Sequence, residues 1–546
     1  MERRVSLRAG FWNRGYIIKI LSVVIAMIFV LSGCSTQREV PTSDDKYRNY
    51  YEVFVRSFYD SNGDGIGDIN GIIEKLDYLN DGDNKKHSDL GIDGIWLMPI
   101  MPSPTYHKYD VTDYYSIDDQ YGTMEDFEKL INECNMRGIK VILDLVLNHT
   151  SYRHPWFTSA RESIGIEPCG QEVCKYEELC SKHNKYCAYY NFSKEPKGKG
   201  YYNIGRPNGW YYEGVFWDQM PDLNLQNEEL LKDIISIGEF WIDKGVSGFR
   251  LDAVTQFYGE NISKNNEFLK EFYEAMKEYK DDVYMVGEAW TNAGSIEEYY
   301  ESGIDSFFNF PYAQATGNIV NAVRMGIGRK FSEDLEIWQK SIKGKNKDAI
   351  DAVFLSNHDN GRSAGYLGRD LGKEKMAASL YLMMPGNSFI YYGEEIGMIG
   401  SGIDENKRMP FLWSNNSKEG IAYAPPNATQ TENIEVGVIE QEKDKDSLLE
   451  FYKKAIRLKN SNKEIARGTV KSIDLGNDSI CAYSSSYEGS KIIIIHNLGN
   501  GKAEVQLSKK QYEYERLSGY LSANNKKVIL KGEKLVLPPM STAVIR

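Results

Sequence analysis

The sequence predicts an α/β fold: a (β/α)8 TIM barrel with an inserted domain after the third strand and a C-terminal antiparallel β-sandwich domain. Apolar strand-like runs alternate with amphipathic helix-like stretches through most of the chain. Three of these runs end at an acidic residue: Asp252, Glu288 and Asp359. From about residue 464 the pattern changes to short β-like runs, which indicates a separate domain.

The expected barrel strands are short apolar runs, each of a length typical for a buried parallel strand. They are residues 50–58, 92–99, 141–148, 246–252, 283–289, 306–310, 353–359 and 389–394. Helix-like stretches lie between several of them, for example residues 123–136 and 227–243. Eight strands in alternation with helices favour a closed barrel over an open sheet.

One connection is too long for a simple strand–helix unit. About 97 residues separate residue 148 from residue 246, whereas such connections are usually short. We therefore predict an inserted domain over residues 150–222, between barrel segments 47–149 and 223–462. After a helix at 448–458, β-like runs such as 479–484 and 491–496 predict the C-terminal domain, residues 463–546.

The N-terminus has the pattern of an export signal. Residues 1–19 are basic, residues 20–31 are apolar, and Leu31-Ser32-Gly33-Cys34 is similar to a bacterial lipoprotein processing site. The apolar run is short for a membrane-spanning helix. We expect residues 1–33 to be a signal peptide, Cys34 to carry the lipid and residues 34–46 to form a tether. The predicted location is extracytoplasmic, anchored to a bacterial membrane; an uncleaved anchor is the alternative.

Four of the seven cysteines fall within twenty residues of one another. They are Cys169, Cys174, Cys180 and Cys187. Their gaps differ from the two-residue gap of common zinc sites, and in an exported protein one or two local disulfides are the expected outcome. Free thiols or a metal site are the alternatives, and the pairing is not fixed by the sequence.

Charge and composition narrow the choice of partner. The net charge is −13, and without residues 1–33 the chain has 60 basic and 77 acidic residues, a net charge of −17. An acidic protein repels nucleic acids, so we expect no nucleic-acid partner. Aromatic residues reach 12%, including 38 Tyr; some could stack on sugar rings, although most are expected in the core. We expect a monomer.

The three acids suit glycoside chemistry. A retaining glycosidase needs one ionised carboxylate as nucleophile and one protonated carboxyl as acid. Arg250 lies two residues before Asp252, so both side chains point the same way on a strand and the cation favours the charged carboxylate. Glu288 is followed by Ala289 and Trp290, an apolar setting that favours a raised pKa. Surface salt bridges are the alternative, but the runs are too apolar for surface elements.

With these motifs the chain resembles glycoside hydrolase family 13, the α-amylase family. The motifs occur in the family's order: residues 144–150, 220–224, 248–252, 287–290 and 357–359. The resemblance implies that Asp252 is the nucleophile, Glu288 the general acid/base and Asp359 the carboxylate that holds the distorted sugar. The 220–224 motif, Met-Pro-Asp-Leu-Asn, resembles the lipoprotein α-amylases intermediate between oligo-1,6-glucosidases and neopullulanases.

The resemblance also implies a substrate-binding set. It comprises Tyr109, His149, Arg250, His358 and Arg408. The two histidines could instead be structural, but each lies beside a motif residue at a strand end. The stretch Tyr106-His107-Lys108-Tyr109 is similar to that of true α-amylases, and no acid stands at Tyr106 to bind a chain end. At Thr255-Gln256 the chain departs from the Lys-His of many amylases, which puts the leaving-group subsites in doubt.

A calcium site is expected in the first loop of the barrel. Residues 60–68 alternate oxygen-bearing residues with glycines, as an EF-hand loop does. The ligands would be Asp60, Asn62, Asp64, Ile66 and Asp68, and the ion, Ca²⁺, would be structural. The EF-hand's closing glutamate is absent, because Gly71 stands there. A glycine- and aspartate-rich turn without an ion is the alternative.

The predicted function is endo-acting, retaining hydrolysis of α-1,4-glucosidic bonds in starch and maltooligosaccharides. An exo-acting α-glucosidase, an oligo-1,6-glucosidase or a neopullulanase-like enzyme is the first alternative. A glucan-binding surface lipoprotein without catalysis is the second, and turnover of starch would discriminate it from the enzymes.

Overall fold

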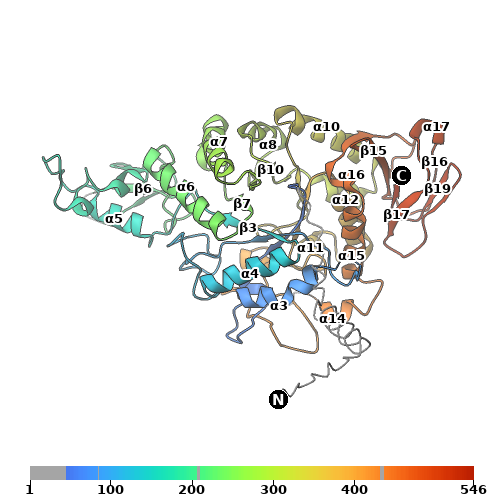
Figure 1. Ribbon diagram of the computed structural model, residues 1–546, viewed down its shortest axis with the longest axis horizontal. Coiled ribbons are helices and arrows are strands. Elements are labelled where there is room, and N and C mark those ends of the chain that lie inside the picture. The colour runs from blue at the N-terminus through green and yellow to red at the C-terminus, as the bar shows by residue number, and fades with distance from the viewer. Residues whose placement is uncertain (1–44, 84, 206–208, 431–433, 435) are drawn as a thin grey trace, which may run out of the picture. The chain divides into compact units, whose positions relative to one another are not determined.

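A computed structural model describes residues 45–83, 85–205, 209–430, 434 and 436–546 (Figure 1). The predicted signal peptide 1–33, the lipidation residue Cys34 and nearly all of the tether 34–46 lie outside these ranges. Among the residues described, no helix combines the length and the apolar character that crossing a bilayer requires.

The predicted (β/α)8 barrel is confirmed. Its strands are β1 (Asn49–Val53), β2 (Gly94–Leu97), β3 (Lys140–Leu145), β7 (Gly248–Leu251), β9 (Tyr284–Gly287), β10 (Ser306–Phe307), β11 (Ala352–Phe354) and β12 (Asn387–Tyr391). They pair in parallel in the order β10-β9-β7-β3-β2-β1-β12-β11. A parallel bridge from Phe308 to Ala352 joins the first and last strands and closes the barrel.

The observed strands are shorter than the apolar runs that predicted them. The run 50–58 is a strand only to Val53 and then turns into the short helix α2 (Val55–Phe58). Phe58 remains fully buried, and the Ser57 hydroxyl donates to the Arg408 carbonyl at 2.7 Å. Apolar character therefore continues into the loops above the barrel, because those loops are packed there against one another.

The helices begin where the capping residues indicate. The outer helices include α3 (Ile69–Leu79), α4 (Met124–Met136), α6 (Glu228–Asp243), α7 (Ile262–Tyr279), α8 (Ala293–Tyr299), α9 (Asn318–Met325), α10 (Arg329–Lys345), α12 (Leu371–Leu382) and α15 (Leu448–Asn460). Thr123 and Asp126 form a capping box at the start of α4. The Asn227 side chain accepts the amides of Glu229 and Leu230 at the start of α6. Each satisfies backbone donors that the first helical turn leaves unpaired.

The segment between β3 and α6 forms the predicted insertion. It contains α5 (Pro155–Ser163), the 3₁₀ turns η1 (Glu177–Leu179) and η2 (Lys185–Ala188), and a small sheet in the order β4-β6-β5. Those strands are β4 (Phe192–Ser193), β5 (Tyr201–Asn203) and β6 (Tyr211–Glu213), cyan to green in Figure 1. Phe157 of α5 packs edge-on against Tyr190 and Tyr212, so aromatic contacts supply much of this segment's core.

The expected disulfides are not formed in the insertion. Cys169, Cys174, Cys180 and Cys187 are all free thiols. The first three converge on His183, whereas the Cys187 thiol lies near the Ala160 carbonyl, at 3.7 Å. The prediction failed because it counted gaps between cysteines alone and left out the histidine.

The C-terminal domain is antiparallel, as predicted. One sheet has the order β13-β14-β15-β20-β17 and the other β16-β19-β18. The strands are β13 (Thr469–Ser472), β14 (Ile480–Tyr487), β15 (Ser490–Asn497), β16 (Ala503–Gln506), β17 (Leu517–Ser522), β18 (Ile529–Lys531), β19 (Lys534–Leu537) and β20 (Ser541–Ile545). Alternation along β14 divides the core: Cys481 and Tyr483 join the barrel's apolar cluster, while Ile480 and Ala482 join that of the second sheet.

The tight contact of β7 with β9 provides a test of the barrel. A Cβ at Gly248 would lie 1.9 Å from the Tyr284 carbonyl oxygen, a backbone atom that cannot move aside. Gly248→Ala should therefore destabilise the protein by about 3 kcal/mol or more, measured by thermal and urea unfolding. The control is Gly344→Ala at an exposed position of helix α10, where a Cβ meets nothing and a small gain in stability is expected. Equal stability of the two variants would contradict this packing.

Candidate active site

The three predicted catalytic acids follow three strands of the barrel at their carboxyl ends. Asp252 follows β7 and Glu288 follows β9, and the register pairs Leu251 with Gly287, so the two acids leave neighbouring strands side by side. Asp359 lies in the loop after β11. This is the face of a (β/α)8 barrel where strand ends bring polar side chains together.

Arg250 on β7 joins the acids into one cluster. Its side chain is fully buried, and its Nη1 lies 2.8 Å from Asp144 Oδ1 and 2.5 Å from Asp252 Oδ1. Its Nη2 lies 3.1 Å from Glu288 Oε2. The prediction that Arg250 accompanies Asp252 is confirmed, and the contact extends to Glu288. A buried guanidinium stabilises an ionised carboxylate beside it.

Burial makes Glu288 a weak acid. Desolvation is the main cause, and the charges of Asp252 and Asp359 add to it, so the pKa of Glu288 rises to about 7 although Arg250 opposes the shift. The Ala253 amide donates to Glu288 Oε2 at 3.0 Å, from a residue in the left-handed region with a φ of 48°. A carboxyl with this pKa is protonated near neutral pH and can serve as a general acid.

Asp359 has the opposite environment. Its Oδ1 lies 2.7 Å from Arg408 Nη2 and its Oδ2 3.0 Å from His358 Nε2. Burial alone would raise its pKa, but the His358 and Arg408 charges hold the pKa of Asp359 well below its usual range. The structure therefore places the predicted residues His358 and Arg408 together with Asp359, and keeps this carboxylate ionised.

His358 is held by a residue that the sequence reasoning missed. Glu52, on β1, accepts from His358 Nδ1 at 2.6 Å. Burial lowers the pKa of His358, but Asp359 and Glu52 outweigh it and raise the value to about 10, so the imidazole is charged. Glu52 is one acid inside an apolar strand, and that exception to an otherwise buried run is the signal that could have identified it.

Tyr109 contacts both the carboxyl cluster around Arg250 and the residues around Asp359. Its ring stacks on His358 with centroids 5.5 Å apart, and its hydroxyl donates to Asp144 Oδ2 at 2.9 Å. Desolvation raises the pKa of Asp144 to about 6 against the pull of Arg250. Asp144 belongs to a motif that the sequence singled out, but its contacts with Tyr109 and Arg250 were not foreseen.

His149 lies at the same end of the barrel with one nitrogen available. Its buried Nε2 has no hydrogen-bond partner in the described structure, and its ring packs on Phe216 of the insertion. Burial lowers the pKa of His149, with the Asp252 charge opposing, so the imidazole is neutral and can bind a hydroxyl group. Thr255 and Gln256 follow Asp252 closely in the chain, and their side chains contact each other at 3.3 Å.

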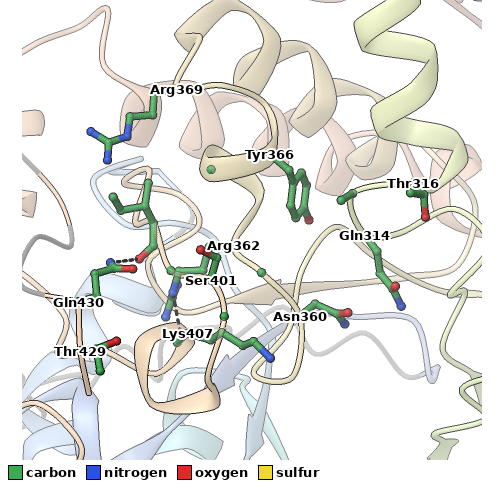
Figure 2. A pocket seen from close by; sticks show the side chains of 16 residues that line it. Gln314, Thr316, Asn360, Arg362, Tyr366, Arg369, Ser401, Lys407, Thr429 and Gln430 are labelled. Carbon is green, nitrogen blue, oxygen red and sulfur yellow. Dashed lines mark hydrogen bonds between the residues drawn. The ribbon is translucent and has the colours of Figure 1, made fainter. Parts of the chain in front are cut away.

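A cavity of about 970 Å³ adjoins the Asp359 loop (Figure 2). Asn360, Gly361 and Lys407 line it, together with Gln314, which Figure 2 shows beside Asn360, and Thr316. Lys407 Nζ donates to the Asp359 carbonyl at 2.7 Å, which fixes the loop at the cavity's edge. The lining is mixed polar and apolar, as expected for a surface that contacts neutral sugars.

The predicted calcium residues lie in the loop between α2 and α3, whose backbone also bonds to Gly420 and Tyr423, at 2.9 and 2.7 Å. Asp60 accepts the amides of Gly63 and Gly65 at 2.7 and 2.8 Å, and the Asn62 and Asp64 side chains accept the amides two residues on. Asp68 caps α3 by accepting the Gly71 amide. The donor set of carboxylate, amide and carbonyl oxygens suits a hard cation such as Ca²⁺.

Comparison with known proteins identifies the family. The family described as "Alpha amylase, catalytic domain" matches residues 52–468, and "Alpha-amylase SusG C-terminal domain" matches residues 480–544. The chain belongs to the α-amylase family, glycoside hydrolase family 13. It is therefore a glycoside hydrolase, as the three acids predicted.

Several known proteins are similar to this chain along most of its length. Alpha-amylase 3 of Dictyoglomus thermophilum is 40% identical, covering 92% of this chain and 93% of that protein. An oligo-1,6-glucosidase of Bacillus cereus is 30% identical, covering 82% and 89% respectively. The structure of Eubacterium rectale Amy13B aligns with a TM-score of 0.85 at 42% identity, covering 92% of this chain and 95% of that one.

The raised pKa of Glu288 predicts how activity depends on pH. Because the acid must be protonated, kcat/KM should fall about tenfold per pH unit above pH 7, measured between pH 5 and pH 9. The folded pKa also exceeds the unfolded one, so the stability that the proton provides is complete below about pH 4.5 and lost as pH rises through 7. Between about pH 4.5 and pH 7, the free energy of unfolding of Glu288→Gln should therefore rise by up to about 3 kcal/mol relative to that of wild type.

The control for this pH experiment is Glu271→Gln, an exposed glutamate on α7. Its stability difference from wild type should not change between pH 5 and pH 8. A decline of wild-type kcat/KM that begins well below pH 6, or a Glu288→Gln difference that is independent of pH, would contradict the proposed protonation state.

Proposed function

We propose that this glycoside hydrolase cleaves internal α-1,4-glucosidic bonds of starch and maltooligosaccharides with retention of configuration. The observation that carries the proposal is the single buried guanidinium of Arg250, which contacts both Asp252 and Glu288. It keeps the nucleophile and the acid close together, as a double displacement through a covalent glycosyl-enzyme requires.

Each residue has a role in two balanced steps. In the first, an Asp252 oxygen attacks the anomeric carbon while Glu288 gives its proton to the leaving glycosidic oxygen. In the second, Glu288 takes a proton from water, the hydroxide oxygen bonds to the anomeric carbon, and Asp252 leaves as a carboxylate. Asp359, held by Arg408, and the charged His358 would bind the hydroxyls of the distorted sugar.

Two features support α-1,4 specificity and internal cleavage. Two relatives named as α-amylases, Alpha-amylase 3 of Dictyoglomus thermophilum and the solved α-amylase of H. orenii, are 40% and 39% identical to this chain. The relatives named as oligo-1,6-glucosidases are 28–30% identical, and Alpha-amylase SusG is 28% identical. The hydroxyl of Tyr106 accepts from Arg408 at 3.2 Å at the site, so a neutral residue stands where we expect exo-acting relatives to place an acid for a chain end. The exo-glucosidase and neopullulanase-like activities are outcomes of the test below.

Product analysis tests this proposal. The protein, residues 35–546 with Ca²⁺, is incubated separately with soluble starch, pullulan and isomaltose, and products are followed over time. We expect a fast fall in starch chain length with mixed maltooligosaccharides, and little attack on isomaltose. Asp252→Ala should lower kcat by about 10⁴-fold or more without changing the fold.

The remaining outcomes separate the alternatives. Glucose as sole product, or faster turnover of isomaltose than of starch, would replace the proposal with an exo-acting α-glucosidase or an oligo-1,6-glucosidase. Release of panose from pullulan would indicate a neopullulanase-like enzyme. An Asp252→Ala variant with near wild-type turnover would refute the nucleophile assignment, and absence of all products would leave a glucan-binding surface protein.

We also propose that the enzyme is a monomer and that Cys34 attaches it to the outer side of a bacterial membrane.

We further propose that the loop 60–68 binds one structural Ca²⁺. The ligands would be the side chains of Asp60, Asn62, Asp64 and Asp68 and the Ile66 carbonyl. The loop's backbone bonds to Gly420 and Tyr423 rather than to the three acids, so the ion would hold the segment between α2 and α3 against that part of the chain and take no part in the chemistry.

Removal of Ca²⁺ should therefore lower the melting temperature before it lowers the specific activity. Binding only to the folded state stabilises by RT ln(1 + [Ca²⁺]/Kd), about 2.7 kcal/mol at a hundredfold excess over Kd. Differential scanning calorimetry of wild type with EGTA or excess Ca²⁺ measures this. In Asp64→Ala the two conditions should give the same melting temperature. A wild-type protein that is insensitive to EGTA would contradict the site.

A further inference from the structure

Four metal-binding side chains converge in the inserted segment, outside the catalytic site. Cys169, Cys174, Cys180 and His183 each direct one ligand atom to a common point, and the four atoms all lie within 4.8 Å of one another. Among the residues described, these four side chains bring cysteine and histidine ligand atoms close enough together to hold one metal ion.

The distances suit tetrahedral coordination. His183 Nδ1 lies 3.4 Å from the Cys169 sulfur and 3.2 Å from the Cys180 sulfur. A tetrahedral zinc site with bonds of about 2.0–2.3 Å has edges of about 3.5–3.8 Å between its ligand atoms. The observed cluster therefore needs only small side-chain adjustments to close around one ion.

The arrangement suits a metal better than a disulfide. A disulfide joins two sulfurs at about 2.05 Å and makes no use of a third thiol or an imidazole. Here no two sulfurs are bonded, and three of them surround one ring nitrogen. Cys187, the fourth cysteine of the run, lies outside the group and contacts the Ala160 carbonyl instead.

The segment that carries the cluster has almost no core of its own. Of residues 165–179, all but Cys169 and Cys174 are exposed, including the apolar residues Val173, Tyr176 and Leu179. So little burial cannot offset the entropy of ordering a chain, and short segments of this kind usually need a covalent or metal cross-link.

One end of the segment is already fixed to the enzyme. The buried Asn184 side chain donates to Ser159 Oγ and Ser163 Oγ of α5, at 2.9 and 2.8 Å, and to the Glu178 carbonyl at 3.1 Å. His183 and Cys180 are joined by a backbone hydrogen bond of 3.0 Å, next to this anchor. Cys169 and Cys174 lie on the exposed part, so a shared ion would tie that part to α5.

We propose that Cys169, Cys174, Cys180 and His183 bind one Zn²⁺ ion in a closed structural site that orders residues 165–183 of the insertion. The three thiols lose their protons to solvent on binding, the imidazole binds through Nδ1, and the ion stays divalent throughout. Four protein ligands leave no position for water or substrate, so the site is structural and is independent of glucan hydrolysis.

Metal analysis of the full-length protein tests the site. Protein produced with zinc in the medium and purified without chelators should contain about one zinc per chain by mass spectrometry of the elements. Cys174→Ser and His183→Gln should each lose most of it. Cys187→Ser is the matched control from the same run of cysteines, and it should retain the zinc.

A second readout reports on order rather than metal content. With Ca²⁺ present, a zinc-selective chelator should release the ion and expose Lys175 and Lys182 to trypsin, and added Zn²⁺ should restore protection. Cys174→Ser should be cleaved at these sites without chelator. Starch hydrolysis by this variant should stay within about twofold of wild type, because the segment does not contact the three acids.

Three results would overturn the proposal. One is protein without bound zinc after reduction and dialysis against Zn²⁺. The other is intact-mass and peptide analysis under non-reducing conditions that shows a disulfide among Cys169, Cys174 and Cys180 in protein isolated without oxidant. Equal zinc content in Cys187→Ser and Cys174→Ser, both low, would place the ion elsewhere and would also contradict it.

Discussion

A single buried cation organises the catalytic end of this barrel. Arg250 has no exposed surface, and its guanidinium contacts Asp144, Asp252 and Glu288. Several carboxyl groups enclosed in one apolar place would repel one another and would take up protons. The guanidinium offsets part of this by pairing with three of them, although the pKa values of Asp144 and Glu288 stay raised. It packs over the Trp96 ring at 5.2 Å. Arg250 therefore holds three of the carboxyl groups beside one another, while Asp359 lies against His358 and Arg408.

The neighbours of each carboxyl, rather than its type, decide its role. Glu288 is buried, and the Arg250 charge offsets only part of the cost of burial, so its pKa rises to about 7. Asp359 is more exposed and has two cations beside it, His358 and Arg408, and its pKa falls. His358 is charged because Glu52 lies behind it. One proton donor and one fixed anion thus result from two side chains of nearly the same chemistry.

Much of this could be predicted from sequence because strand ends and acids are local features. The eight strands, Arg250 two residues before Asp252, and the capping residues Thr123 and Asn227 are all visible in short windows. Glu52 could not be assigned, since its partner His358 lies 306 residues away, in the loop after β11. That loop is brought toward β1 only by the pairing of β12 with both β11 and β1. His183 was missed for a related reason: its ligand role emerges only when the loop folds back on α5.

The barrel and the insertion differ in what holds their side chains in place. In the barrel, side chains such as Phe308 and Phe389 are held by apolar neighbours on all sides, with rings 4.9 Å apart, so burial fixes the fold and leaves polar groups free for chemistry. In residues 165–183 burial is scarce, and polar groups must supply the order themselves. Histidine and cysteine in such a setting indicate a cross-link, whereas histidine at a strand end, like His149, indicates a ligand for substrate. The surroundings of each residue therefore discriminate structural from catalytic roles.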